Sequence, residues 1–382
     1  MSWVGELWPR FPDVHRIAVL RGSGLGDLVQ ALPAVEALRA AYPRSSVTLL
    51  GTPAHAALLQ GRPSPFDSLE VLPLRPGVRD GGLEDPSATA TFLQQMRGRG
   101  FDLAIQLHGG GRNSNPFLLE LGARHTIGTR TEDAPELERT RPYVYYQHEV
   151  VRALEVAALA GAVPVQLEPR LPLLPDERDR LRHRPERPTV TLHPGATDPR
   201  RRWPAPAYAA VASALAADGV RVVVVGDHAD VPAAAEILTL TGDPDDLVSS
   251  QAGLQTLPEL VQTLLESDVV LANDSGPRHV AAALGVRTVG IYWVGNLVNA
   301  GPLGRGRHRV QVGFTPACPV CGVDITQVGW TAERCEHDDS IVADVRPGPV
   351  LADVRSLLRD AQQERRESAA GATSGGRDGQ MG

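Results

Sequence analysis

The sequence contains no lysine, only three cysteines and no long hydrophobic run. All 38 basic residues are therefore arginines, which together with the many Ala, Gly and Pro residues indicates the codon bias of a GC-rich genome. Acidic residues number 45, and a chain with the resulting net charge of −7 lacks the basic footprint of a dedicated nucleic-acid binder. Three cysteines are too few for a disulfide framework, so none is expected.

No stretch approaches the ~18 consecutive apolar residues that a membrane-spanning helix needs, so we expect at most peripheral membrane contact. The segment from Met1 to Pro12 lacks the basic region and apolar run of a secretory signal, which predicts a cytoplasmic protein. With 382 residues, 42% of them hydrophobic, the chain is long enough for two domains with sizeable cores.

Short apolar runs alternate with helical patterns, and this order predicts an α/β fold of two doubly wound units with parallel sheets. Pro33 lies inside the first predicted helix, 28–42, and should kink or restart it. The expected strands lie at 15–20, 47–50 and 103–107, and then at 189–192, 222–225, 269–272 and 288–291. Ligands of such sheets bind beyond the carboxyl ends of the strands, so functional motifs should follow strands and face a cleft between the units.

The predicted organisation has two domains joined by a linker. The N-terminal domain spans 13–166, and the linker, rich in proline and arginine, spans 167–188. The C-terminal domain spans 189–348 and is followed by a helix at 349–366. The Gly- and Ser-rich tail, 367–382, is expected to be disordered.

The first motif is the glycine-rich turn RGSGLGD, residues 21–27, between a strand and a helix. Its glycine spacing differs from the G-x-G-x-x-G of dinucleotide-binding oxidoreductases, and it lacks the Lys-Ser/Thr of a P-loop. Asp27 begins the helix. It is either a helix cap or a carboxylate at the mouth of a cleft that accepts a proton from a hydroxyl group.

Two further motifs follow strands in the second half. HPGAT, residues 193–197, precedes Arg201 and could bind phosphate oxygens, or it is an ordinary turn with solvated arginines. NDSGPRH, residues 273–279, opens a helix, and free amides at a helix start bind anions. His279 would add a hydrogen bond or charge to a diphosphate there, or it is a surface histidine on a capped helix.

The cysteines cluster late in the chain. Cys318-x-x-Cys321 and Cys335-x-His337 together offer four ligands for a structural zinc, with Asp338 and Asp339 as substitutes. The other interpretation is that reduced thiols merely pack a loop, and a closed thiolate site has no open position for catalysis.

Together these motifs resemble glycosyltransferase family 9, the ADP-heptose:lipopolysaccharide heptosyltransferases. The resemblance covers roughly residues 13 to 360 and is carried by RGSGLGDLVQALPAVEALRAAYP (21–43), FDLAIQLHGG (101–110), HPGATDPRRRWP (193–204) and NDSGPRHVAAALG (273–285). It implies the family's GT-B fold, in which two Rossmann-like domains face a central cleft. The first would bind the acceptor, and the second the nucleotide sugar.

The resemblance also implies roles for single residues. Asp27 matches the family's general base, and Arg201 stands where the family usually has Lys. The donor-binding set would be Gly195, Ala196, Thr197, Arg201, Asp274, Ser275, Gly276 and His279. The implied reaction moves a heptose from ADP-heptose to a glycan hydroxyl by inverting single displacement, with no metal or other cofactor.

The sequence does not decide between several classes of acceptor. The acceptor would be lipopolysaccharide core, another glycan, a glycolipid or a small molecule, and its candidate contacts are Arg21, Gly24, His108, Arg112 and Asn113. His108 is equally a loop histidine with internal partners. Asp227 and Asp230 are candidates for ribose contacts. A nucleotide-sugar 2-epimerase and a non-catalytic sugar-nucleotide-binding protein are the alternatives on the same fold.

Overall fold

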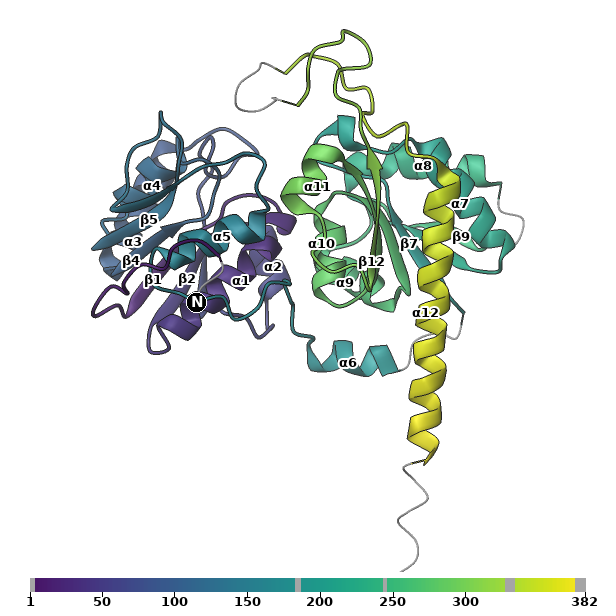
Figure 1. Cartoon of the computed structure of the whole chain (residues 1–382), viewed down its shortest axis with the longest axis horizontal. Helices are drawn as coiled ribbons and strands as arrows, with labels where there is room; N and C mark the ends of the chain where they lie inside the picture. The colour runs from purple at the N-terminus through teal and green to yellow at the C-terminus, as the bar shows by residue number, and fades with distance from the viewer. Residues whose placement is uncertain (1–3, 183–186, 243–245, 327–333, 375–382) are drawn as a thin grey trace, which may run out of the picture. The chain divides into compact units, whose positions relative to one another are not determined.

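The computed structural model describes residues 4–182, 187–242, 246–326 and 334–374. The chain divides into two compact units, shown with their elements in Figure 1. Unit 1 comprises Met1–Leu174 together with Gly295–Leu303, and unit 2 comprises Pro175–Val294 together with Gly304–Gly382. Among the described residues, no helix combines the length and apolarity needed to cross a membrane.

Unit 1 is built on a six-stranded parallel sheet in the order β3-β2-β1-β4-β5-β6. Its strands are β1 (Arg16–Leu20), β2 (Ser46–Gly51), β3 (Ser68–Val71), β4 (Leu103–Gln106), β5 (His125–Arg130) and β6 (Arg139–Pro142). Its helices are α1 (Leu25–Ala41), α2 (Pro53–Leu59), α3 (Pro86–Arg99), α4 (Ser114–Glu120) and α5 (Glu149–Ala158). Strand order reverses between β1 and β4, so the turns after these two strands flank the position where such sheets bind ligands.

Helix α1 runs without interruption through Pro33, so the predicted restart there is wrong. Proline removes one backbone hydrogen bond and crowds the preceding turn. The burial of Leu32, Ala34 and Val35 around Pro33 keeps this helix in place, and α1 packs along α5 in the core of unit 1. Tertiary burial therefore overrides a local preference that the sequence alone displays.

Unit 2 repeats the architecture with the sheet order β12-β11-β10-β7-β8-β9. Its strands are β7 (Thr189–His193), β8 (Arg221–Val224), β9 (Val248–Ser250), β10 (Val269–Asn273), β11 (Arg287–Trp293) and β12 (His308–Gly313). Its helical segments are α6 (Pro175–Arg182), η1 (Pro199–Arg201), α7 (Ala205–Ala217), η2 (His228–Asp230), α8 (Val231–Thr241), α9 (Leu257–Glu266), α10 (Gly276–Ala283) and α12 (Pro347–Ser374). Order reverses between β7 and β10, and these strands carry the two motifs of the second half.

Three boundaries differ from the expected organisation. Helix α6 forms inside the expected linker. Helix α11 (Val294–Ala300) lies in a segment assigned to unit 1, where His148 Nε2 lies 2.7 Å from the Gly301 carbonyl oxygen.

Helix α12 begins at Pro347 and continues to Ser374, although the residues after 366 were expected to be disordered. One Glu and three Ala residues at 367–374 favour helix, which the Gly and Ser content of the whole tail obscures. The end of the tail, 375–382, lies outside the described residues.

The glycine-rich turn after β1 is packed against neighbouring backbone. A Cβ on Gly22 would lie 1.8 Å from the Val78 carbonyl oxygen, so no larger residue fits without moving the chain. Gly24 is the N-cap of α1 and lies in open space, where a Cβ would meet only the Asp27 carboxylate at 3.7 Å. The first glycine therefore serves close packing, and the second leaves the helix start accessible.

We predict that Gly22→Ala destabilises the protein by about 1–3 kcal/mol, because the added methyl group forces the backbone around Val78 to shift. Gly24→Ala is the matched control and should change stability by less than about 1 kcal/mol. Urea unfolding of both variants against the parent measures the difference. Equal midpoints for the two variants would contradict the packing assigned to Gly22.

Candidate functional site

Asp27 presents a carboxylate at the start of α1, just beyond β1. Its Oδ2 accepts a hydrogen bond from the Gly24 amide at 3.1 Å, and its Oδ1 accepts one from Arg21 Nη2 at 2.8 Å. The side chain is 42% exposed, so solvent or a ligand reaches it. The sequence placed Asp27 as either a cap or a reactive carboxylate, and the geometry allows both, since one oxygen caps the helix while the group stays accessible.

Arg21 is a buried cation between two carboxylates. Besides Asp27, its guanidinium contacts Glu149 at 3.4 Å and donates to the Leu107 carbonyl. Burial opposes the charge, but Asp27 and Glu149 outweigh it and hold the pKa of Arg21 above its ordinary value. Arg21 therefore stays charged and fixes the orientation of Asp27.

Glu149 was not found from the sequence, where it is one acidic residue among 45. It begins α5, and Arg152 one turn later forms an ion pair with it. A shallow recess lies here within unit 1. Its lining residues are Arg21, Ala31, Leu107, Gly109, Thr129, Glu149, Arg152, Ala153 and Val156.

Two histidines support the glycine-rich turn. His108 Nδ1 accepts a hydrogen bond from the Gly22 amide at 3.2 Å, and His55 Nε2 lies 3.3 Å from the Gly24 carbonyl oxygen. Burial is the main cause that lowers the pKa of each to about 4. Both rings are therefore neutral at neutral pH. His108, a candidate acceptor contact, thus has an internal partner as well.

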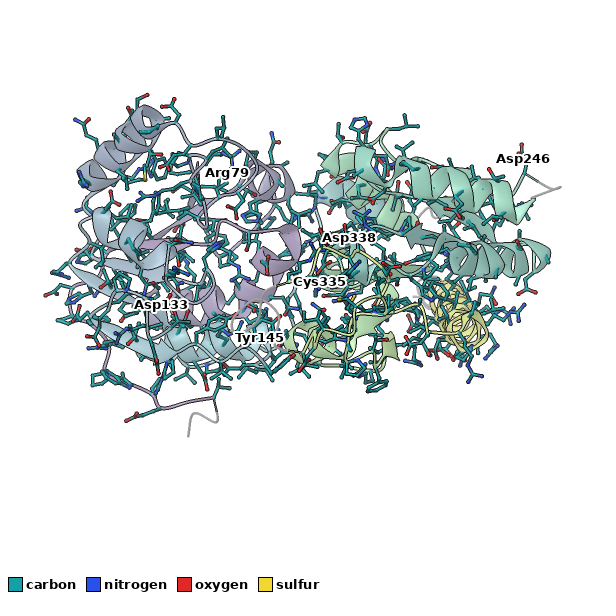
Figure 2. The ribbon with its side chains drawn as sticks, turned by 90° about the horizontal axis from the view of Figure 1, so that it is seen from above. Arg79, Asp133, Tyr145, Asp246, Cys335 and Asp338 are labelled. Carbon is teal, nitrogen blue, oxygen red and sulfur yellow. The ribbon has the colours of Figure 1, made fainter. Side chains whose placement is uncertain are left out.

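The remaining acceptor-side candidates, Arg112 and Asn113, lie on the exposed loop before α4. Arg112 Nε is 3.3 Å from a carboxylate oxygen of Asp133, which Figure 2 labels. Both partners of this ion pair are more than half exposed, so the pair holds the loop only weakly. Of the five candidates, the structure places Arg21, Gly24 and His108 around one turn and leaves these two at the surface.

In unit 2, a buried carboxylate gathers cations at the start of α10. Asp274 follows β10 and accepts from Arg201 Nη1 at 3.2 Å, while its other oxygen lies 3.0 Å from His279 Nε2. Burial would raise the pKa of Asp274, but His279, Arg201 and Arg278 outweigh it and lower that pKa. The second-half motifs therefore meet through their charged side chains, as their positions after neighbouring strands predict.

The surroundings of this cluster are suited to an anion. Ser275 is the N-cap of α10, so the first amides of the helix lie beside Arg201 and His279. The Ser275 hydroxyl lies 3.0 Å from His193 Nδ1. Thr197 is exposed and Ala196 is buried, its carbonyl accepting from Arg202. A helix start flanked by an arginine and a histidine that can donate hydrogen bonds is a site where proteins bind phosphate groups.

His193 and Asp230 form a buried pair that fixes the HPGAT turn. His193 Nε2 lies 3.5 Å from Asp230 Oδ2, and hydrogen bonding to His193 outweighs burial to lower the pKa of Asp230. A Cβ on Gly195 would lie 2.4 Å from Asp230 Oδ2, so only glycine fits. The Asp230 carboxylate is thus buried and paired with His193, whereas the sequence had made it a candidate for contacting a ribose. Asp227 caps η2 through the Ala229 amide.

The cysteine cluster forms in unit 2 as the spacing predicts. One ligand atom from each of Cys318, Cys321, Cys335 and His337 lies within 4.8 Å of all the others. Amides of Cys321 and Val320, together with the neighbouring thiols, lower the pKa of the Cys318 thiol to about 6. Gly322 takes a positive φ of 73°, and its amide donates to the Cys318 carbonyl, closing a tight turn around the first pair. Asp338, a predicted substitute ligand, pairs with Arg334 instead.

Comparison with known proteins identifies a family. Residues 89–319, more than half of the chain, match the family model of glycosyltransferase family 9 (heptosyltransferase). Lipopolysaccharide heptosyltransferase 2 of Salmonella typhimurium is 25% identical over 362 residues, which cover 90% of this chain and 99% of the relative.

Solved structures share the fold. The structure of E. coli ADP-heptose lps heptosyltransferase II superposes with a TM-score of 0.69 at 22% identity and covers 91% of this chain and 99% of its own. A glycosyl transferase family 9 protein from Veillonella parvula gives a TM-score of 0.71 at 19% identity, with coverage of 91% and 97%. The chain therefore has the GT-B fold, made of two Rossmann-like domains.

We predict that Asp274→Asn destabilises the protein by roughly 3 kcal/mol at pH 7, because buried cations lose their counter-charge. The folded-state pKa of Asp274 is lowered, so its contribution is present above the unfolded-state pKa of about 3.9 and is lost as pH falls through the folded value. The difference between parent and variant should therefore shrink below about pH 4.

Urea unfolding at several pH values measures this difference. Asp227→Asn, which changes an exposed aspartate of the same unit, is the control and should leave the midpoint nearly unchanged. A difference between parent and Asp274→Asn that stays constant down to pH 3 would show that the carboxylate charge does not stabilise this cluster.

Proposed function

Because this chain belongs to glycosyltransferase family 9, we propose that it transfers a heptose from ADP-heptose to a hydroxyl of a lipopolysaccharide-core-like acceptor. The observation that carries the proposal is a complementary pair of sites. One unit holds an accessible carboxylate beyond β1, and the other holds a cation-flanked helix start beyond β10. The names of the relatives support a heptose as the group transferred and lipopolysaccharide as the acceptor, and the name of the E. coli structure supports ADP-heptose as the donor.

Unit 1 is the acceptor domain in this proposal. The recess beside Asp27 contains two arginines, Arg21 and Arg152, and one carboxylate, Glu149, so together with Asp27 its charges balance. A recess whose charges balance favours a neutral hydroxyl-bearing group over a strongly charged one. Gly24, His108, Arg112 and Asn113 would lie along the rest of the acceptor path.

Asp27 is the proposed general base. It takes the proton of the acceptor hydroxyl as the oxygen forms a bond to the anomeric carbon of the donor. Arg21 orients the carboxylate before the acceptor binds. A single displacement at this carbon inverts its configuration.

Unit 2 is the donor domain. As the bond between the anomeric carbon and the diphosphate breaks, negative charge develops on the leaving ADP. Arg201, His279 and the amides at Ser275 and Gly276 would stabilise it, with Gly195, Ala196 and Thr197 forming the opposite wall of the phosphate site. Asp274 acts through the cations that it holds in place. These groups supply the positive charge that a metal ion provides in other transferases, so no metal is needed for transfer.

The Cys318, Cys321, Cys335 and His337 cluster is proposed to hold a structural zinc. Three thiolates and an imidazole would supply four protein ligands, a set typical of structural rather than catalytic zinc. A zinc ion with four protein ligands would support the fold of unit 2 and would take no part in the bond changes.

We predict that Asp27→Asn lowers kcat by about 10²–10⁴-fold while ADP binding is unchanged, because the amide cannot accept the proton. Glu136→Gln, an exposed acid of the same unit, is the matched control and should keep parental turnover. ADP release measures turnover, and calorimetry measures ADP binding. Near-parental turnover of Asp27→Asn would overturn the assignment of the base.

A donor screen tests the substrate directly. Turnover with ADP-heptose should exceed turnover with ADP-, GDP- and UDP-hexoses, measured as nucleoside diphosphate release with a lipopolysaccharide-core acceptor. A preference for a GDP- or UDP-sugar would refute the proposed donor, and ADP-heptose transfer to a different glycan only would refute the proposed acceptor.

A further inference from the structure

The loop that carries the cysteine cluster also contacts the arginine segment of the donor site. Figure 1 shows the chain leaving β12 in a long loop before it returns to α12. Cys335 and Asp338, labelled in Figure 2, lie on the returning part of this loop. The same part continues to Ser340 and Ile341, which contact η1 and the residue after it.

Two hydrogen bonds hold the backbone on both sides of Arg201. The Ile341 amide donates to the Arg200 carbonyl at 2.8 Å, and the Ser340 hydroxyl donates to the Arg202 carbonyl at 2.6 Å. Because both neighbours of Arg201 are held, its backbone position depends on where Ser340 and Ile341 lie. The Arg201 side chain then reaches Asp274 at 3.2 Å.

A charged contact reinforces the same junction. Arg334, next to Cys335, lies 3.6 Å from an Asp198 carboxylate oxygen. Asp198 caps η1 and receives Arg200 Nη2 at 2.6 Å, so it fixes the start of the arginine segment. The loop therefore touches this segment at its beginning, middle and end.

The returning part of the loop has little burial of its own to hold it. Between Arg334 and Ser340 every residue is exposed or only half-buried, and most are polar. Ordering such a stretch costs about 1–2 kcal/mol per residue of backbone entropy, which few apolar contacts offset here. A cross-link between Cys335, His337 and the Cys318–Cys321 turn would supply the missing restraint.

One atom points independently to a bound metal. Nδ1 of His337 is buried and has no hydrogen-bond partner among the described residues, although buried ring nitrogens normally have one. This imidazole belongs to the cluster of four ligand residues. A metal ion would satisfy the ring and close the ligand set.

We propose that a zinc ion on Cys318, Cys321, Cys335 and His337 clamps the Arg200–Arg202 backbone through Ser340 and Ile341, and so sets the affinity of unit 2 for the donor diphosphate. The inference rests on the structural zinc and the donor site proposed above. Zinc stays remote from the bond changes and acts by positioning Arg201. Loss of the ion releases the loop and, with it, the carbonyl contacts on either side of Arg201.

The first test uses the intact protein with zinc, after chelation under reducing conditions, and after zinc is restored. Hydrogen exchange should show a protected Ile341 amide with zinc and exchange at least about tenfold faster without it, reversibly. ADP affinity by calorimetry should fall about tenfold on chelation and recover with zinc. Metal analysis of the reduced protein should find zinc bound.

The outcomes separate the proposals. Unchanged Ile341 exchange and unchanged ADP affinity after zinc removal would overturn the clamp. Reduced protein that binds neither added zinc nor another metal would overturn the metal centre, and iron in place of zinc would overturn the identity of the ion. If the untreated protein binds no ADP, the proposed donor fails, while the Ile341 exchange still decides the clamp.

Substitutions test whether the zinc site affects ADP binding through Ser340, without the use of a chelator. Cys335→Ser should lose zinc and weaken ADP binding, whereas Ser340→Ala should keep zinc and still weaken ADP binding by about two- to fivefold, through one lost hydrogen bond. Glu336→Gln, an exposed neighbour with no assigned role, is the control and should match the parent in zinc content and ADP affinity. Parental ADP affinity in Ser340→Ala would refute the route through Ser340.

Discussion

Near the strand-order reversal of its sheet, each unit holds a buried charged side chain that lies between groups able to carry the opposite charge. In unit 1 the buried ion is Arg21, held between Asp27 and Glu149. In unit 2 it is Asp274, held between Arg201 and His279. A buried charge is tolerated only with partners, so these ions dictate which side chains gather beyond the strands. The partners that remain partly accessible are Asp27 and Arg201, the groups to which the proposed reaction assigns contacts with substrates.

The scaffold explains why local motifs were found so readily from the sequence. RGSGLGD and NDSGPRH each join a buried strand to a helix, and glycine spacing, capping residues and the strand before them are all local signals. The cysteine cluster was also predicted from spacing alone. Cys318 with Cys321, and Cys335 with His337, are so close in sequence that the two members of each pair must also lie close in space. Their roles in transfer stay predictions, because the fold positions residues without showing which reaction they perform.

Contacts between residues that lie far apart in the chain could not be predicted from the sequence. Glu149 lies 128 residues from Arg21, and only the packing of α5 against α1 brings them together. Its position after a strand made Asp230 a candidate for a ligand contact. In the structure, however, its carboxylate is buried, pairs with His193 and packs against Gly195. The strand β6, with the sequence RTRP, carries no apolar pattern because it is an edge strand. In each case tertiary contacts decide the partner of a residue or the structure of a segment, and such contacts produce no periodic pattern in the sequence.

The division into two units resolves a conflict in the chemistry. A general base must stay anionic, whereas a diphosphate site must be cationic, and placing both in one small cluster would pair the base with the phosphate ligands. Here Asp27 is balanced by Arg21 within unit 1, and Arg201 is balanced by Asp274 within unit 2. Asp27 and Arg201 therefore each have a partner of opposite charge within their own unit. The Asp27 carboxylate is thus partly exposed while it is paired within its own unit.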